Sequence, residues 1–157
     1  MRFMTLVVAL TFGAASLAAA RAQSKMAAGV EAGALHLSDE SLFQLGLRVT
    51  PSRGGYGSVD FAFATFPDEL ANGAFVFLMD LGITSGAPSD SSPVYVFPHG
   101  GVSLLAGGGA VFGYNVGAGL LLRASPSLGF SFDYTYRRFT SDQVPMSSIT
   151  VGLMFLH

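Results

Sequence analysis

The stretch Ala110–Phe139, AVFGYNVGAGLLLRASPSLGFSFDYTYRRF, predicts two antiparallel strands joined by a tight turn. Successive side chains of a strand point to opposite faces of a sheet, and both arms of this stretch alternate with that period. One face is bulky and apolar or aromatic, with Phe112, Tyr114, Val116, Ala118, Leu120, Leu122, Leu128, Phe130, Phe132, Tyr134 and Tyr136. The other face is mostly small or polar, with Gly113, Asn115, Gly117, Gly119, Leu121, Arg123, Gly129, Ser131, Asp133, Thr135 and Arg137. Between the arms, Ala124-Ser125-Pro126-Ser127 predicts the turn, because proline presets a turn φ and serine can bond the local backbone.

The same alternation recurs along the rest of the chain and predicts six further strands. Their expected ranges are Ala27–Leu37, Leu42–Thr50, Tyr56–Phe66, Ala74–Thr84, Val94–Leu105 and Met146–His157. Their lengths are close to the roughly 9 to 11 residues that a tilted membrane-crossing strand needs. Within the fifth range, Pro98 lacks a ladder donor and Gly100-Gly101 weakens the segment, which together predict a bulge or interruption.

The composition indicates a membrane protein that crosses with strands. Charged residues make up 11% of the chain, against about 25% in ordinary soluble domains. The mean hydropathy is +0.51, and Lys25 is the single lysine of the sequence. Beyond the N-terminal segment, however, no uninterrupted apolar run reaches the roughly 18 residues of a spanning helix. We therefore predict an eight-stranded antiparallel up-and-down transmembrane β-barrel, in which a closed ladder satisfies every backbone group.

The N-terminal segment has the pattern of a secretory signal peptide. Arg2 supplies a positive start, Phe3–Ala19 is almost wholly apolar, and Ala20-Arg21-Ala22 fits the small-x-small cleavage pattern. We predict a signal peptide over residues 1–22 and a barrel domain over residues 23–157. An uncleaved membrane helix is the alternative, because the apolar run approaches spanning length. The chain contains no cysteine, which excludes an acylated N-terminal cysteine and disulfide staples.

The size and charge of the side chains decide which face lies inside the predicted barrel. A soluble lipocalin-like barrel that binds an apolar ligand is the alternative, but its polar face should carry many Lys and Glu. Here that face is rich in glycine and lightly charged, which favours a narrow lumen. The predicted lumen collects Glu31, Arg48, Asp60, Asp80, Arg123, Asp133 and Arg137. Because buried opposite charges have to pair, we expect an ion-pair network that plugs the lumen; a narrow porin-like channel is the alternative.

Several segments resemble those of the small outer-membrane β-barrel proteins of Gram-negative bacteria, of the OmpA transmembrane domain and OmpX type. They are Gly113–Gly119, Ala124–Ser127, Phe132–Phe139 and Ile149–Phe155. The resemblance implies an outer-membrane location with both termini in the periplasm and contact with outer-membrane lipid and lipopolysaccharide. It also implies that the barrel-assembly machinery reads the last strand. The resemblance implies fold and location but no particular activity, because this fold hosts many roles. We expect a monomer with a structural or surface-interaction role, no catalytic activity and no cofactor.

Individual residues carry only weak signals for chemistry. Small barrels of this kind include lipid A-modifying enzymes that use His, Ser and an acid at the outer rim. His36 and Ser38, beside Asp39 and Glu40, are weak candidates for such a site, and chance proximity is the favoured interpretation. His99 is interpreted as a strand-break residue, and Tyr114, Tyr134, Tyr136 and Phe139 as an interfacial aromatic belt. No spacing predicts a metal site, and the scarcity of Lys and Arg argues against nucleic acid.

Overall fold

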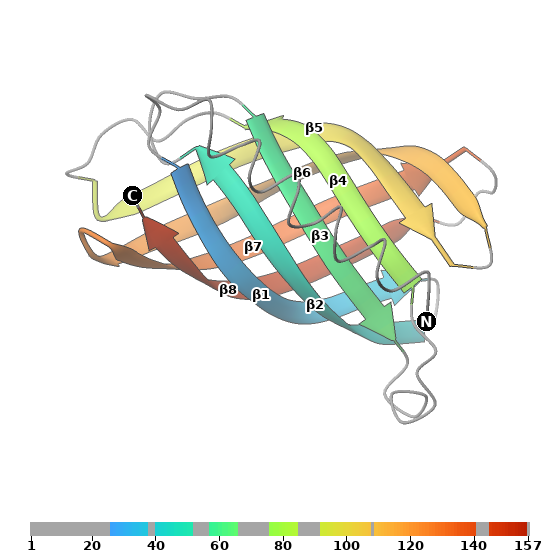
Figure 1. The fold of residues 1–157 in the computed structure, drawn as a ribbon, viewed down its shortest axis with the longest axis horizontal. Coiled ribbons are helices and arrows are strands. Elements are labelled where there is room, and N and C mark those ends of the chain that lie inside the picture. Colours follow the sequence, from blue (N-terminus) through green and yellow to red (C-terminus); the bar gives the residue numbers. More distant parts are fainter. Residues whose placement is uncertain are drawn as a thin grey trace, which may run out of the picture.

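The computed structural model of the protein is a closed barrel of eight antiparallel strands (Figure 1). It describes residues 26–37, 40–51, 57–65, 76–84, 92–107, 109–140 and 145–156. The strands are β1 (Met26–Leu37), β2 (Glu40–Pro51), β3 (Gly57–Thr65), β4 (Val76–Thr84), β5 (Val94–Ala106), β6 (Ala110–Ser125), β7 (Leu128–Phe139) and β8 (Met146–Leu156). The predicted signal peptide and Ser38 lie outside the described residues. In the described part of the chain, no helix is long and apolar enough to cross a membrane.

Each strand pairs with its neighbours in the sequence, and the first strand pairs with the last. The β1–β8 ladder runs from Ala27 opposite Leu156 to Leu37 opposite Met146 and closes the sheet. A closed sheet has no open edge on which backbone groups would need partners from elsewhere. The predicted fold class is therefore confirmed.

The predicted hairpin is formed by β6 and β7. Its ladder runs from Gly113 opposite Phe139 to Ser125 opposite Leu128, with a register shift between Arg123 and Ser125. In the turn, the backbone N–H of Ser127 donates to Oγ of Ser125 at 3.3 Å. The expected Pro-Ser turn chemistry thus occurs where the sequence places it.

The bulge or interruption predicted in the fifth strand is absent from the described residues. The β5–β6 register is continuous from Val94 opposite Leu122 to Ala106 opposite Ala110, through Pro98. The carbonyl of Pro98 accepts a 3.2 Å bond from Oγ1 of Thr84, which ends β4. The nitrogen of Pro98 faces that same side, because both backbone groups of a β residue point toward one neighbour. Proline therefore lies where β4 ends and costs the ladder little.

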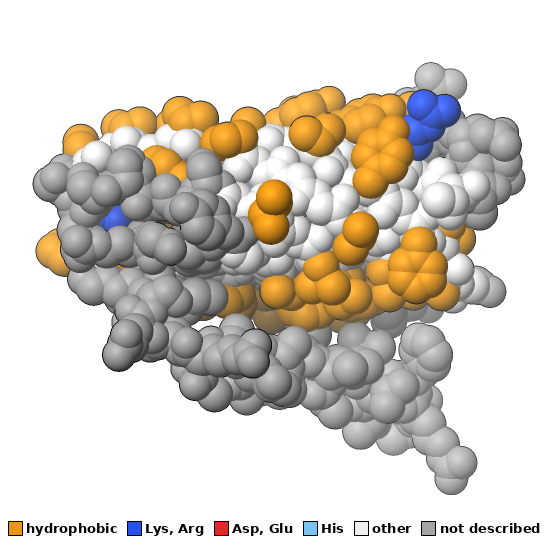
Figure 2. All heavy atoms as spheres, turned by 90° about the horizontal axis from the view of Figure 1, so that it is seen from above, with side chains coloured by type: hydrophobic (Ala, Val, Ile, Leu, Met, Phe, Trp, Pro, Cys, Tyr) orange, Lys and Arg blue, Asp and Glu red, His pale blue; other side chains and the backbone are white. Residues whose placement is uncertain are grey.

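Apolar side chains cover the outside of the barrel, and polar side chains fill much of its inside. Ile83, Phe112 and Val96 are 69%, 64% and 61% exposed, whereas Ser103 and Thr135 are each 1% exposed. Figure 2 shows the same distribution on one face, where hydrophobic side chains are spread over the wall and basic ones lie toward its ends. The predicted assignment of faces is confirmed by this burial pattern.

Two apolar clusters occupy the inside near the two ends of the barrel. We call the end that holds Met26 and Leu156 the terminal end, and the end that holds Leu37 and Met146 the loop end. The terminal cluster consists of Ala27, Phe97, Leu121, Met154 and Leu156, with Tyr95 packed against it. The loop cluster consists of Leu35, Leu42, Ala62, Ala64, Leu78, Phe139 and Met146, with Leu37, Leu105 and Val111 packed against it. The polar interior lies between them.

The loop cluster corrects one sequence prediction. Phe139, expected in an interfacial belt, is 6% exposed and lies inside. Its position follows the alternation of β7, in which Asp133, Thr135 and Arg137 also point inward. Phe97 also points inward, so aromatic rings of both Phe97 and Phe139 lie in the lumen. Phe97 fits because Gly119 faces it across the β5–β6 ladder, where a Cβ would overlap the ring.

Candidate functional site

Arg48 on β2 is the centre of one polar cluster in the barrel interior, which we call the Arg48 cluster. Its Nε donates to Oδ1 of Asp60 on β3 at 2.5 Å. Its Nη1 lies 3.1 Å from Oε1 of Glu31 on β1 and 3.2 Å from Oδ2 of Asp133 on β7. The guanidinium carbon also lies 5.7 Å from the ring centroid of Phe97, which links the cluster to the apolar terminal end. One guanidinium thus joins carboxylates from three other strands.

His99 on β5 belongs to the same cluster. Its Nε2 lies 2.9 Å from Oδ2 of Asp133, whose other oxygen accepts a 2.6 Å bond from Oγ1 of Thr135. The imidazole has room because Gly117 faces it in the ladder, where a Cβ would lie 2.6 Å from Cε1 of His99. The interpretation of His99 as a strand-break residue is therefore wrong. The sequence signal that could have placed His99 inside was its position four residues before the small polar Ser103, on the same face of the strand.

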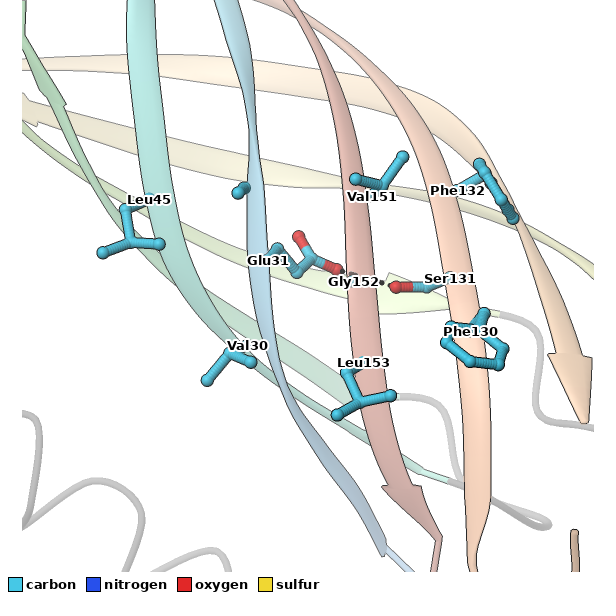
Figure 3. Close-up of a pocket in the computed structure, with 10 residues that line it drawn as sticks. Val30, Glu31, Leu45, Phe130, Ser131, Phe132, Val151, Gly152 and Leu153 are labelled. Carbon is cyan, nitrogen blue, oxygen red and sulfur yellow. Dashed lines mark hydrogen bonds between the residues drawn. The ribbon is translucent and has the colours of Figure 1, made fainter. Parts of the chain in front are cut away.

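Glu31 completes the Arg48 cluster with hydrogen bonds across β8. Its two carboxylate oxygens accept from Oγ of Ser131 at 3.4 Å and Oγ1 of Thr150 at 3.2 Å. Gly152 stands between Glu31 and Ser131 in the ladders, and Figure 3 shows the bond passing behind this strand. A Cβ at Gly152 would lie 2.5 Å from Oγ of Ser131, so a glycine is needed at this crossing.

Arg137 on β7 is the centre of a second polar cluster, the Arg137 cluster. Its Nε and Nη2 both donate to Oδ2 of Asp80 on β4, at 2.8 and 2.5 Å. Its Nη1 donates to Oγ of Ser148 at 2.7 Å. The other oxygen of Asp80 accepts a 2.5 Å bond from Ser103, which in turn accepts a 3.0 Å bond from Nδ2 of Asn115. This cluster combines one cation and one anion with neutral partners.

The structure thus divides the seven predicted lumen charges. Glu31, Arg48, Asp60 and Asp133 meet in one cluster, and Asp80 and Arg137 in the other. Arg123 lies nearer the terminal end, opposite Gly129, and makes interactions of its own there. The sequence analysis placed Asn115 on the inward face but did not identify hydrogen-bond partners for the lumen charges. These partners are Ser103, Asn115, Ser148 and Thr150. The alternation of a strand shows which face a residue occupies, but not which residue of another strand it meets.

These clusters hold charged side chains in fixed positions, each paired with an opposite charge or a hydroxyl group. Each carboxylate that they contain is engaged by a guanidinium or a hydroxyl, and the groups are held from several strands at once. Among the described residues, no group of three or more His, Asp and Glu side chains could hold a metal ion.

His36 lies apart from both clusters, on the outer face near the loop end. Its Nδ1 lies 2.8 Å from Oγ of Ser41, its partner in the β1–β2 ladder. Ser38, the predicted partner, lies outside the described residues, as does Asp39. The imidazole therefore has a hydroxyl neighbour that the sequence analysis did not identify.

Known structures share this architecture. Neisserial surface protein A matches with a TM-score of 0.62 and 14% identity, covering 85% of this chain and 97% of that chain. The N-terminal β-barrel domain of Pseudomonas aeruginosa OprF has a TM-score of 0.56 and 11% identity, with 82% and 97% covered. Ail, the attachment invasion locus protein of Yersinia pestis, has a TM-score of 0.51 and 14% identity, with 85% and 97% covered.

These similarities define a fold class. The chain has the fold of the small eight-stranded outer-membrane β-barrels, and at these identities the likeness concerns the fold alone. No protein-family model and no curated protein sequence matches the chain.

Proposed function

We propose that the protein is a bacterial outer-membrane β-barrel with a structural or surface-interaction role, a closed lumen and no catalytic activity. The observation that carries the proposal is the distribution of side chains, which is the reverse of that in a soluble protein. Large apolar residues are exposed on the outer wall, while charged residues are buried inside.

The outer wall supports the membrane location. Phe112, Val96 and Leu45 are more than half exposed, and they are only three of many large apolar side chains on this surface. Soluble proteins rarely expose large continuous apolar surfaces, because contact between apolar surface and water is unfavourable in free energy. Hydrocarbon solvates such a wall well, and the closed ladder leaves no strand edge within it.

The interior supports a closed lumen rather than a narrow channel. A passing ion would have to cross an apolar cluster near each end and displace the paired side chains between them. Removing a partner from a buried ion pair costs about 3 to 5 kcal/mol, which disfavours transient opening. Eight strands also enclose an interior that side chains are just able to fill.

The surface role is supported by the proteins that share the fold. One carries the words surface protein in its name, and another is named for attachment and invasion. We propose a comparable location for this chain, with its termini in the periplasm and its last strand read by the barrel-assembly machinery. In this strand, Phe155 lies on the outer face and is 47% exposed.

Planar-bilayer recording tests the closed lumen. The full-length mature protein, refolded in detergent and inserted into the bilayer, should give no steady current above the lipid baseline, while a known porin conducts under the same conditions. Insertion is checked separately by flotation of the protein with vesicles. A steady unitary conductance of the inserted wild-type barrel would overturn the closed-lumen proposal and favour the narrow channel.

A further inference from the structure

Four neighbouring strands carry a row of polar side chains on the outer face near the loop end. Ser41 on β2 faces His36 on β1, His36 faces Ser147 on β8, and Ser147 faces Tyr136 on β7. The side chain of Leu35 points inward and is 2% exposed. Because successive side chains of a strand point to opposite faces, that of His36 points outward. We call these four residues the polar row.

The same four strands form an apolar hollow further down the outer wall. It has a volume of about 290 Å³, and its walls include Leu45, Ala32, Val151 and Phe132, which are partners in one register row. Figure 3 shows the apolar side chains that surround this hollow, together with the bond between Glu31 and Ser131. The volume is about twice the roughly 150 Å³ of an apolar cavity that holds one benzene molecule, so it suits one acyl chain.

The polar row and the hollow are aligned. Each hollow residue of that register row lies four positions from a polar-row residue on its own strand, as Ala32 does from His36. At about 3.3 Å per residue this separation is roughly 13 Å along the strand. One leaflet of the hydrocarbon core is about 15 Å deep, so a single lipid molecule can occupy both places.

The polar row offers donors to an anion. In the tautomer whose Nδ1 accepts the Ser41 hydroxyl proton, Nε2 of His36 carries a hydrogen that can be donated. Ser147 offers a hydroxyl beside it, and Arg138 lies exposed at the loop end of β7, two positions beyond Tyr136. Arg138 is the only Arg or Lys on the outer face of the described strands, and it lies on the β7 side of the polar row. The exposed carboxylate of Glu40 lies on the opposite side, at the start of β2. The β7 and β8 side of the row is therefore the part that is complementary to a phosphate.

We propose that this face of β2, β1, β8 and β7 binds one molecule of lipid A, with a phosphate at the polar row and one acyl chain in the hollow. The inference rests on the proposed outer-membrane location with the loop end outward, since the loop end then lies in the lipopolysaccharide leaflet. It assigns a specific site on the wall, which a merely apolar surface would not provide.

Native mass spectrometry of the refolded mature barrel in detergent tests the site with three probes: lipid A, lipid A stripped of its phosphates, and phosphatidylglycerol. The wild-type barrel should retain one lipid A, and retention should fall several-fold without the phosphates. His36→Ala combined with Ser147→Ala should lower retention of lipid A by at least about tenfold, the loss expected for one hydrogen bond of about 1.5 kcal/mol to a charged group.

Filling the hollow provides the second arm. Ala32→Phe and Val151→Phe should each lower retention, while Ala118→Phe, the same substitution as the first on the exposed outer face of β6, should leave it unchanged. Equal retention by the Ala32→Phe and Ala118→Phe barrels would overturn the site. Equal retention of phosphate-free lipid A, or preferential retention of phosphatidylglycerol, would overturn the proposed ligand.

A folding control separates this inference from the proposed function. Each variant is first run unheated in SDS, where a closed barrel migrates differently from its boiled form. A wild-type chain that shows no such form would contradict the outer-membrane barrel itself. A normal barrel that does not retain lipid A would contradict the lipid site alone.

Discussion

At the scale of single residues, Arg48 determines the charge balance of the interior. It contacts Glu31, Asp60 and Asp133, each within 3.2 Å. Arg48→Ala leaves these carboxylates without their shared cation, and removing one partner of a buried ion pair costs about 3 to 5 kcal/mol. We expect a loss of that size in the free energy of unfolding, measured by urea titration in lipid vesicles. Arg138→Ala, the matched exposed arginine, should change it by less than about 0.5 kcal/mol; equal losses would contradict the central role of Arg48.

The glycines that face interior rings provide a second residue-scale prediction. A Cβ at position 119 would overlap the Phe97 ring and lie 2.6 Å from Oδ2 of Asp133. Gly119→Ala should therefore lower the free energy of unfolding by about 1 to 3 kcal/mol, the usual cost of overpacking. Gly57→Ala is the control, because a Cβ there meets nothing within 4 Å. If both alanines were tolerated equally in the urea titration, the close packing of Phe97 against β6 would be wrong.

At the scale of one element, β5 shows where a proline is compatible with a strand. Pro98 lies beyond the last described β4 pair, Thr84 opposite His99, whereas Val102 lies within the ladder opposite Leu81. Pro98→Val should change the free energy of unfolding by less than about 0.5 kcal/mol. Val102→Pro should cost several kcal/mol, because it leaves a carbonyl of β4 unsatisfied in an apolar surrounding.

The fraction of chain that stays folded in unheated SDS gels distinguishes these two variants. A large loss in Pro98→Val, with Val102→Pro unaffected, would mean that the backbone direction inferred from the Thr84 bond is wrong.

At the scale of the whole molecule, closure of β1 on β8 predicts resistance to detergent. The ladder between them extends over nearly the whole of both strands. Neither strand therefore has an unpaired edge from which the sheet could begin to unfold. We expect the unheated protein from the outer-membrane fraction to migrate differently from the boiled protein in SDS gels. Recovery from the periplasm without detergent, with no heat-dependent shift, would instead indicate a soluble barrel.

The sequence by itself determined the architecture of this protein. Period-two alternation is a local property of a strand, so the sequence alone places Phe130, Phe132 and Tyr134 outside and Ser131 and Asp133 inside. The strand ranges required only adjustment at their ends. The exceptions were Pro98, whose cost depends on where the neighbouring strand ends, and Phe139, whose inward position its own alternation already indicated.

Only the tertiary structure decided which charges meet. Arg48 contacts carboxylates of β1, β3 and β7, and Arg137 contacts Asp80 of β4 across the lumen. These contacts depend on the stagger of the strands and on closure of the sheet, which bring together residues that are distant in sequence. The same closure places β8, the last strand, beside β1, the first strand. Both the polar row and the hollow therefore combine residues from the beginning and the end of the barrel sequence.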